Sequence, residues 1–128
     1  MVKWTEYEQT ARGRGALALE LYLVDSVPAG SPEAVKDNLP SHLEYQREME
    51  TRGALVLAGP TSDLSGDEMQ GRGLIVYRAA SMDEAREMAS ADPMHKSGAR
   101  EFTLRKWLVN EGSLSLSVGL STGRAVLS

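Results

Sequence analysis

The sequence of 128 residues contains no cysteine, which excludes several kinds of chemistry. The chain can form no disulfide and no thiolate zinc site, and it has no cysteine nucleophile. It also lacks any apolar run near the ~20 residues that a membrane span requires, and Met1–Glu6 is too polar for a signal peptide. We therefore expect a soluble, cytoplasmic protein without a membrane partner.

Positive charge is scarce as well, with 14 Lys and Arg against 18 Asp and Glu and a net charge of -4. No basic cluster is interleaved with aromatic residues, so we expect no nucleic-acid partner. The glycines of Arg12–Gly15 and Gly71–Gly73 match neither a P-loop nor a dinucleotide fingerprint, and no G-x-S-x-G elbow occurs. The sequence thus predicts no nucleotide cofactor and no serine hydrolase chemistry.

The patterns that are present predict one α+β domain over residues 1–128. Its core, 16–109, reads as strand, helix, strand, strand, helix, strand, the ferredoxin-like order, which gives an antiparallel sheet with both helices on one face. The strands are expected at Ala16–Val24, Ala54–Ala58, Gly73–Arg78 and Glu101–Val109. The helices are expected at Ser31–Arg52, with a kink or restart at Pro40, and at Ser81–Asp92.

Two extensions flank this core. Residues 1–15 should hold a short helix, Trp4–Arg12, which Gly13 and Gly15 end. Residues 110–128 should form a hairpin, because Ser113–Leu120 alternates between polar and apolar residues and turns back into Arg124–Leu127.

The first strand alternates between two largely uncharged faces. One face carries a row of leucines, Leu17, Leu19, Leu21 and Leu23. The other carries Tyr22 and Val24 among small residues, and a sheet covered on one side only would leave this face in water. We therefore expect a homodimer that forms through the sheet face.

A carboxylate and an imidazole form the candidate site. Met82, Ala85 and Ala89 make an apolar helical stripe, and Asp92 is its next member, so a carboxylate points toward the core and needs a donor. The topology places His42 of the first helix beside it. In such a dyad the carboxylate fixes the imidazole tautomer and leaves the other ring nitrogen free to move a substrate proton.

Two other interpretations of these residues remain open at this point. His42 could be a partly exposed helix residue while Asp92 merely caps the turn at Pro93. Alternatively, His95 could join His42 and Asp92 in a metal site with two histidines and one carboxylate. The segment Asp92–His95 is not a ligand motif by itself, so we predict no metal.

The motifs resemble one known family. These are Ser41-His42-Leu43, Ala58-Gly59-Pro60, Ser81 with Asp83-Glu84-Ala85, and Ala91-Asp92-Pro93 followed by Gly98. In this order, from about Leu17 to Trp107, they resemble the YCII-related (YciI-like) family, whose ferredoxin-like members pair sheet to sheet as dimeric α/β barrels. The resemblance implies that His42 and Asp92 are the family's proposed catalytic pair. One characterised branch dehydrochlorinates a chlorinated hydroxyhydroquinone.

These observations predict a cofactor-independent lyase or isomerase that acts on a small, aromatic or enolisable substrate. His42 would be the general base and Asp92 its orienting partner, while Tyr22, Gly59, Pro60 and His95 would shape the pocket. The alternative is a non-catalytic homodimeric protein that binds a small molecule and uses the pair structurally. The two extensions depart from the short family members, so no substrate is transferred from the resemblance.

Overall fold

The computed structural model describes residues 1–127 and divides them into two compact units. The larger unit is Glu20–Leu108, and the smaller one combines Met1–Leu19 with the chain from Val109 onward. The predicted ferredoxin-like core corresponds to the larger unit, which carries the candidate site.

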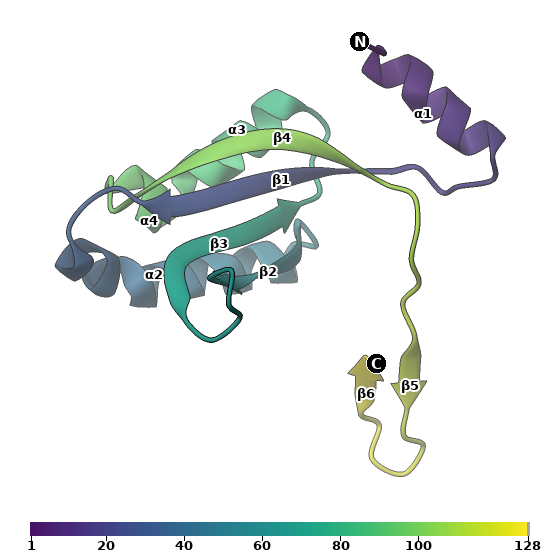
Figure 1. The fold of residues 1–128 in the computed structure, drawn as a ribbon. Coiled ribbons are helices and arrows are strands. Elements are labelled where there is room, and N and C mark those ends of the chain that lie inside the picture. Colours follow the sequence, from purple (N-terminus) through teal and green to yellow (C-terminus); the bar gives the residue numbers. More distant parts are fainter. Residues whose placement is uncertain (128) are drawn as a thin grey trace. The chain divides into compact units, whose positions relative to one another are not determined.

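An antiparallel sheet of four strands forms the larger unit, in the order β2-β3-β1-β4 (Figure 1). Its strands are β1 (Leu19–Pro28), β2 (Leu55–Ser62), β3 (Met69–Tyr77) and β4 (Arg100–Val109). In the central pair, β1 and β3, Tyr22 aligns with Tyr77 and Ser26 with Gly73. This strand order confirms the ferredoxin-like topology predicted from the sequence.

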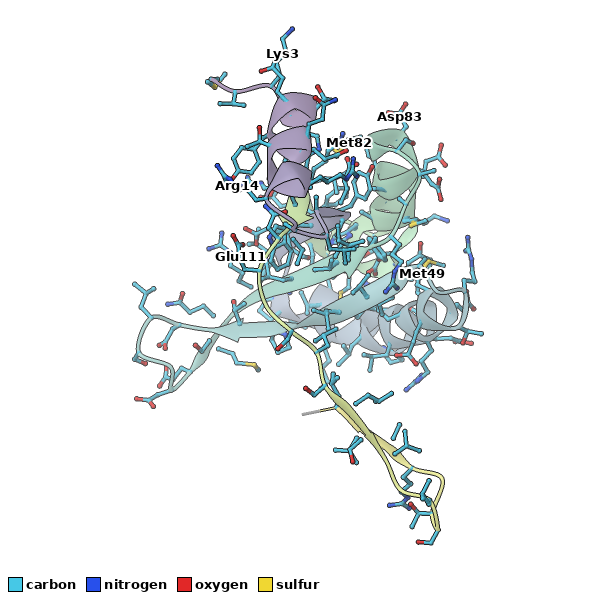
Figure 2. The ribbon with its side chains drawn as sticks, turned by 90° about the vertical axis from the view of Figure 1, so that its right-hand side faces the viewer. Lys3, Arg14, Met49, Met82, Asp83 and Glu111 are labelled. Atoms are coloured by element: carbon cyan, nitrogen blue, oxygen red, sulfur yellow. The ribbon has the colours of Figure 1, made fainter. Side chains whose placement is uncertain are left out.

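Three helices cover one face of this sheet and lie behind it in Figure 1. They are α2 (Pro32–Thr51), α3 (Met82–Ala91) and the short α4 (Pro93–Lys96). Met49 of α2 and Met82 of α3, both labelled in Figure 2, lie on the same side of the sheet. The core between helices and sheet is built from Tyr22, Val24, Met49, Ala54, Ile75, Tyr77, Ala85 and Ala89.

The faces of β1 are reversed relative to our expectation. Tyr22 and Val24 are buried in the core under the helices, so the leucine row from Leu19 to Leu23 points to the outer face. The strand also begins at Leu19 and not at Ala16, because Ala18 has a φ of 49°, outside the β region. Alternation alone does not say which of two apolar faces receives the helices.

Pro40 does not interrupt α2, contrary to the predicted restart, because helical structure is continuous from Pro32 to Thr51. Two side chains bond to the helix backbone near the proline. Asn38 donates from Nδ2 to the Ala34 carbonyl at 2.8 Å, and Ser41 Oγ donates to the Asn38 carbonyl at 3.1 Å. Both helices of the core begin with a serine cap, Ser31 for α2 and Ser81 for α3, as the sequence indicates.

The hairpin of β2 and β3 is longer than predicted and irregular. Strand β2 continues through Gly59 and Pro60, which an edge strand tolerates because the missing N–H can face outward. The register shifts between Pro60 and Ser62, close to where Gly71 of β3 has a φ of 86°. Gly71 therefore bends this strand in a way that other residues would resist.

The smaller unit contains the two predicted extensions. Its helix α1 (Trp4–Gly13) carries an ion pair of 2.9 Å between Glu8 and Arg12. Its strands β5 (Leu116–Val118) and β6 (Ala125–Leu127) form an antiparallel hairpin, with Leu116 aligned to Leu127. In the described part of the chain, 1–127, no helix combines the length and hydropathy needed to span a bilayer.

Candidate functional site

The predicted pair of His42 and Asp92 is formed in the structure. The His42 Nδ1 atom lies 2.8 Å from both Asp92 carboxylate oxygens, across the space between α2 and the junction of α3 with α4. The Asp92 side chain is fully buried, whereas that of His42 is 20% exposed. The carboxylate is therefore hidden behind the imidazole, and the imidazole alone reaches solvent.

Local sequence explains why Asp92 stands at this point. Pro93 disfavours helical geometry at the preceding residue, so α3 ends and Asp92 adopts a φ of -58° and a ψ of 126°. Pro93 then occupies the first turn of α4, and Asp92 caps that helix by accepting a bond of 3.0 Å from the Met94 N–H. Asp92 is thus both a helix cap and the partner of His42.

A third donor holds the carboxylate in place. Gln46, one helical turn after His42 on α2, donates from Nε2 to Asp92 Oδ2 at 3.1 Å. With His42 Nδ1 and the Met94 N–H, the buried carboxylate accepts from three groups, which offset the loss of its hydration. This arrangement fixes its position and, through it, the plane of the imidazole.

The contact with Asp92 also determines which nitrogen of His42 carries the proton. A carboxylate only accepts hydrogen bonds, so Nδ1 must be the N–H donor and neutral His42 keeps the lone pair on Nε2. No residue of the described chain, 1–127, makes a hydrogen bond to this nitrogen. His42 can therefore accept a proton at Nε2 while Asp92 compensates the resulting positive charge.

His42 opens onto a cleft of about 630 Å³ between α2 and strands β2 and β3. Its walls are mostly apolar, with Val35, Leu39 and Leu43 from α2 facing β2 residues from Leu55 onward. The polar side chains on the wall are those of Ser26, His42, Gln46, Glu50, Arg72 and Arg100. A mainly apolar cleft with a few converging polar groups is typical of a site for a small organic molecule.

Of the other residues predicted to shape the pocket, some line the cleft and some do not. Gly59 and Pro60 line the cleft together with His42. Tyr22 is buried in the core, 3% exposed, and does not belong to the cleft wall, because its face of β1 lies under the helices.

His95 also lies behind the cleft wall and not on it. Its Nδ1 donates to the Ala89 carbonyl at 2.7 Å, and its ring stacks obliquely on Phe102 with centroids 4.7 Å apart. Its Nε2 lies 2.8 Å from Ser26 Oγ. Burial lowers the pKa of His95 below its ordinary value, although the Ala89 carbonyl and Asp92 act in the opposite direction.

The metal-site alternative is not supported by this geometry. Both ring nitrogens of His95 are engaged, with Ala89 and Ser26, and His42 Nδ1 is engaged with Asp92. Within the described residues, no group of three or more His, Asp or Glu side chains is placed to hold a metal ion.

Sequence reasoning missed three residues of the site, Gln46, Ser26 and Arg100. Gln46 had a detectable signal, because it follows His42 by one turn on a buried helical face. Arg100 also had one, since it shares a strand face with the apolar, partly buried Phe102 and Leu104. Ser26 was assigned to a loop because β1 was expected to end before it.

Fold and site define a class: a ferredoxin-like α+β protein with a His–Asp pair at the wall of an apolar cleft. The model of the YCII-related domain matches residues 18–108, and the chain belongs to this family. The uncharacterized protein YjpA of Bacillus subtilis (strain 168) is 32% identical over 72 residues, which cover 56% of this chain and 78% of that protein.

A solved enzyme structure is also similar. It is the 5-chloro-2-hydroxyhydroquinone dehydrochlorinase TftG from Burkholderia phenoliruptrix AC1100, in complex with 2,5-dihydroxybenzoquinone. The TM-score is 0.54 with 25% sequence identity, and the match covers 68% of this chain and 92% of that one.

Proposed function

We propose that the protein catalyses a proton transfer on a small cyclic organic substrate, as a lyase or isomerase that uses no cofactor. The observation that carries this proposal is the state of His42, whose Nδ1 is held by the buried Asp92 while Nε2 has no partner in the described residues and the side chain lines the cleft. This is the arrangement that a general base requires.

The roles follow from the contacts. His42 Nε2 takes the substrate proton and later returns it or releases it to water. Asp92 is a positioning residue, since it is fully buried and acts only through the imidazole that it orients. Gln46 and the Met94 N–H hold the carboxylate, so the imidazolium forms beside a negative charge that does not have to move.

The similar dehydrochlorinase suggests a concrete reaction to test. In our proposal, His42 takes a hydroxyl proton from the chlorinated hydroxyhydroquinone and returns it to the carbon that bears chlorine. Chloride then leaves with the electron pair of the C–Cl bond while a second hydroxyl gives its proton to water. The net change is the loss of one HCl, which leaves a hydroxybenzoquinone, and no oxidant is consumed.

The test measures chloride release from 5-chloro-2-hydroxyhydroquinone against the spontaneous background. The His42→Gln variant should lose about 100-fold or more of the rate, which is typical of removing a general base. Glu44→Gln is the matched control, because Glu44 is exposed on the same helix and lies outside the cleft. Circular dichroism should show that both variants fold like the wild type.

Two outcomes would contradict the proposal. One is chloride release by His42→Gln at the wild-type rate. The other is a wild-type protein that binds cyclic substrates but turns over none of them, which would favour the alternative of a small-molecule-binding protein.

We further propose that a second copy of the chain is the partner of the outer sheet face. Within Glu20–Leu108 the helices cover one face only. The cross-strand row of Leu23, Val76 and Leu57 lies on the other face, and Leu57 is exposed. Trp107 of β4, also exposed, lies on that face too, since it alternates with the inward-facing Phe102 and Leu104.

A further inference from the structure

The wall of the cleft contains a cation, Arg100, which has no role in the proton transfer proposed above. It is the first residue of β4 and shares a strand face with Phe102, Leu104 and Lys106, of which Lys106 is paired with Glu20. The side chain is half-buried and lines the same cleft as His42. Partial burial of a guanidinium destabilises the folded protein unless a partner compensates its charge.

The protein supplies Arg100 with neutral partners only. Its Nε donates to Ser26 Oγ at 2.8 Å, and its Nη2 donates to the carbonyl oxygens of Ser26 and Gly71. The two N–H groups of Nη1 have no acceptor in the described residues. Arg100 therefore keeps a full positive charge and unused donors beside an apolar cavity.

Asp25 and Asp92 are already committed to other groups, and Glu50, which also lines the cleft, forms no ion pair with Arg100. Asp25 pairs with Arg72 at 3.0 Å, and Asp92 accepts from His42, Gln46 and Met94. None of the ion pairs among the described residues includes Arg100. A negatively charged group from outside the chain would thus neutralise the charge of Arg100.

The orientation of Arg100 is fixed before any ligand arrives. His95 uses its Nδ1 proton on the Ala89 carbonyl, so its Nε2 must accept the Ser26 hydroxyl proton. The Ser26 oxygen then offers its lone pairs to Arg100 Nε. Because Ser26 is buried and both of its polar groups hold the guanidinium, the donor array loses little freedom on binding.

We infer that Arg100 binds an anionic oxygen of the substrate, so that the cleft takes small cyclic organic anions, either carboxylates or ionised hydroxyls. The inference rests on the proposed function, in which His42 acts on the same molecule from the α2 wall. Arg100 holds the oxyanion by charge-assisted hydrogen bonds and stabilises negative charge that develops when His42 removes a proton. Ser26 and His95 are its positioning residues.

The first experiment uses the wild-type protein, so it does not depend on a variant folding. Two anions, benzoate and 2,5-dihydroxybenzoquinone, are titrated while the arginine Nε–H signals are followed by NMR. Their neutral counterparts are benzamide and the dimethyl ether of the quinone. The Arg100 signal should shift saturably with both anions and little with the neutral compounds. Unchanged Arg100 signals, or no saturable binding of either anion, would overturn the inference.

Variants then measure the contribution of the charge. Arg100→Gln should weaken anion binding about tenfold or more, as expected for lost hydrogen bonds to a charged group, while affinity for the neutral counterparts changes less than about threefold. Arg100→Lys should fall between Arg100→Gln and the wild type because the charge remains but the planar donor array is lost. The matched control is Arg105→Gln, on the same strand but exposed and outside the cleft.

The results also separate this inference from the proposed function. If His42→Gln abolishes turnover while Arg100→Gln binds anions as the wild type does, proton transfer stands and the anion site is wrong. If Arg100→Gln loses anion binding while His42→Gln retains full turnover, the anion site stands and the assigned base is wrong. If Arg100→Gln weakens the binding of anions and of neutral compounds equally, the substitution has changed the shape of the cleft, and this result would also overturn the inference.

Discussion

Asp92 combines two tasks that proteins often give to different residues. It caps α4 through the Met94 N–H and orients His42, and it is fully buried while doing both. Replacing one of its oxygens with an amide nitrogen would set a donor against the donors that surround it. The side chain should therefore tolerate no neutral substitute of the same shape.

We predict that Asp92→Asn lowers the free energy of unfolding by about 2 to 4 kcal/mol, because it leaves buried donors unsatisfied and removes the charge that they solvate. Urea denaturation with an unchanged m-value would measure this loss. Asp83→Asn, in the exposed first turn of α3, is the control and should cost less than about 1 kcal/mol. A loss at Asp92 no larger than at Asp83 would show that the pair is not buried as described.

His95 gives the stability a defined pH dependence. Burial lowers the pKa of His95 in the folded protein, with Asp92 raising it and Arg100 and His42 lowering it. Since the folded pKa is below the unfolded value of about 6.5, this contribution is fully present above pH 6.5 and is lost as the pH falls through the folded pKa. Wild type should lose more stability between pH 7 and pH 5 than His95→Gln does.

The measurement is thermal or urea unfolding across that pH range, together with the His95 ring resonances by NMR. A His95 that titrates above the ordinary histidine value would reverse the sign and refute the prediction.

At the scale of single residues, the sequence predicted the site residues that are polar but occupy or flank an apolar helical stripe. Asp92 could be predicted because its carboxylate occupies the apolar stripe of α3. His42 could be predicted because it flanks the apolar stripe of the neighbouring helix, α2. Ser26 was missed because its role depends on contacts with His95 and Arg100, which are 69 and 74 residues away along the chain. No local pattern encodes such distant pairings.

At the scale of elements, the existence and order of the helices and strands could be predicted from the sequence. Which face of a strand is buried, and where each element ends, could not. Capping serines and alternating strands identified α2, α3 and the core strands. The faces of β1 were assigned in reverse because both are apolar, and only packing against α2 and α3 decides between them. Pro40 was expected to interrupt α2 and β2 was expected to end before Pro60, but α2 is continuous and the edge position of β2 accommodates Pro60.

The bend of β3 at Gly71 provides a test at this scale. Gly71 has a φ of 86°, and a Cβ there would approach Pro28 Cγ to 2.8 Å. We predict that Gly71→Ala lowers the free energy of unfolding by about 1 to 3 kcal/mol, through the left-handed backbone and this clash. Because the Gly71 carbonyl accepts from Arg100, anion binding should weaken as well.

The matched control is Gly59→Ala in the neighbouring strand. A Cβ there would meet nothing within 4 Å, and Gly59 has no positive φ, so stability should change by less than about 1 kcal/mol. Chemical denaturation of both variants measures the contrast. Equal effects at the two glycines would mean that the bend at Gly71 is not required.

At the scale of the whole molecule, the proposed second copy makes a measurable prediction. Sedimentation velocity at micromolar concentration should show a dimer, because the outer sheet face carries Leu57 and Trp107 exposed. Trp107→Glu places a charge on that face and should shift the equilibrium to monomer. Glu87→Lys, exposed on α3, is the control for a change of charge elsewhere. A wild-type monomer would refute the proposed dimer.

The irregular edge of the sheet has a consequence for how copies of this chain can meet. Strand β2 ends the sheet on one side, and Gly59, Pro60 and the register shift interrupt its free backbone. A foreign strand would find a missing N–H and a change of direction there, so the edge is a poor template for strand addition. The β2 edge is thereby protected from strand addition by another molecule, and self-association is directed away from this edge.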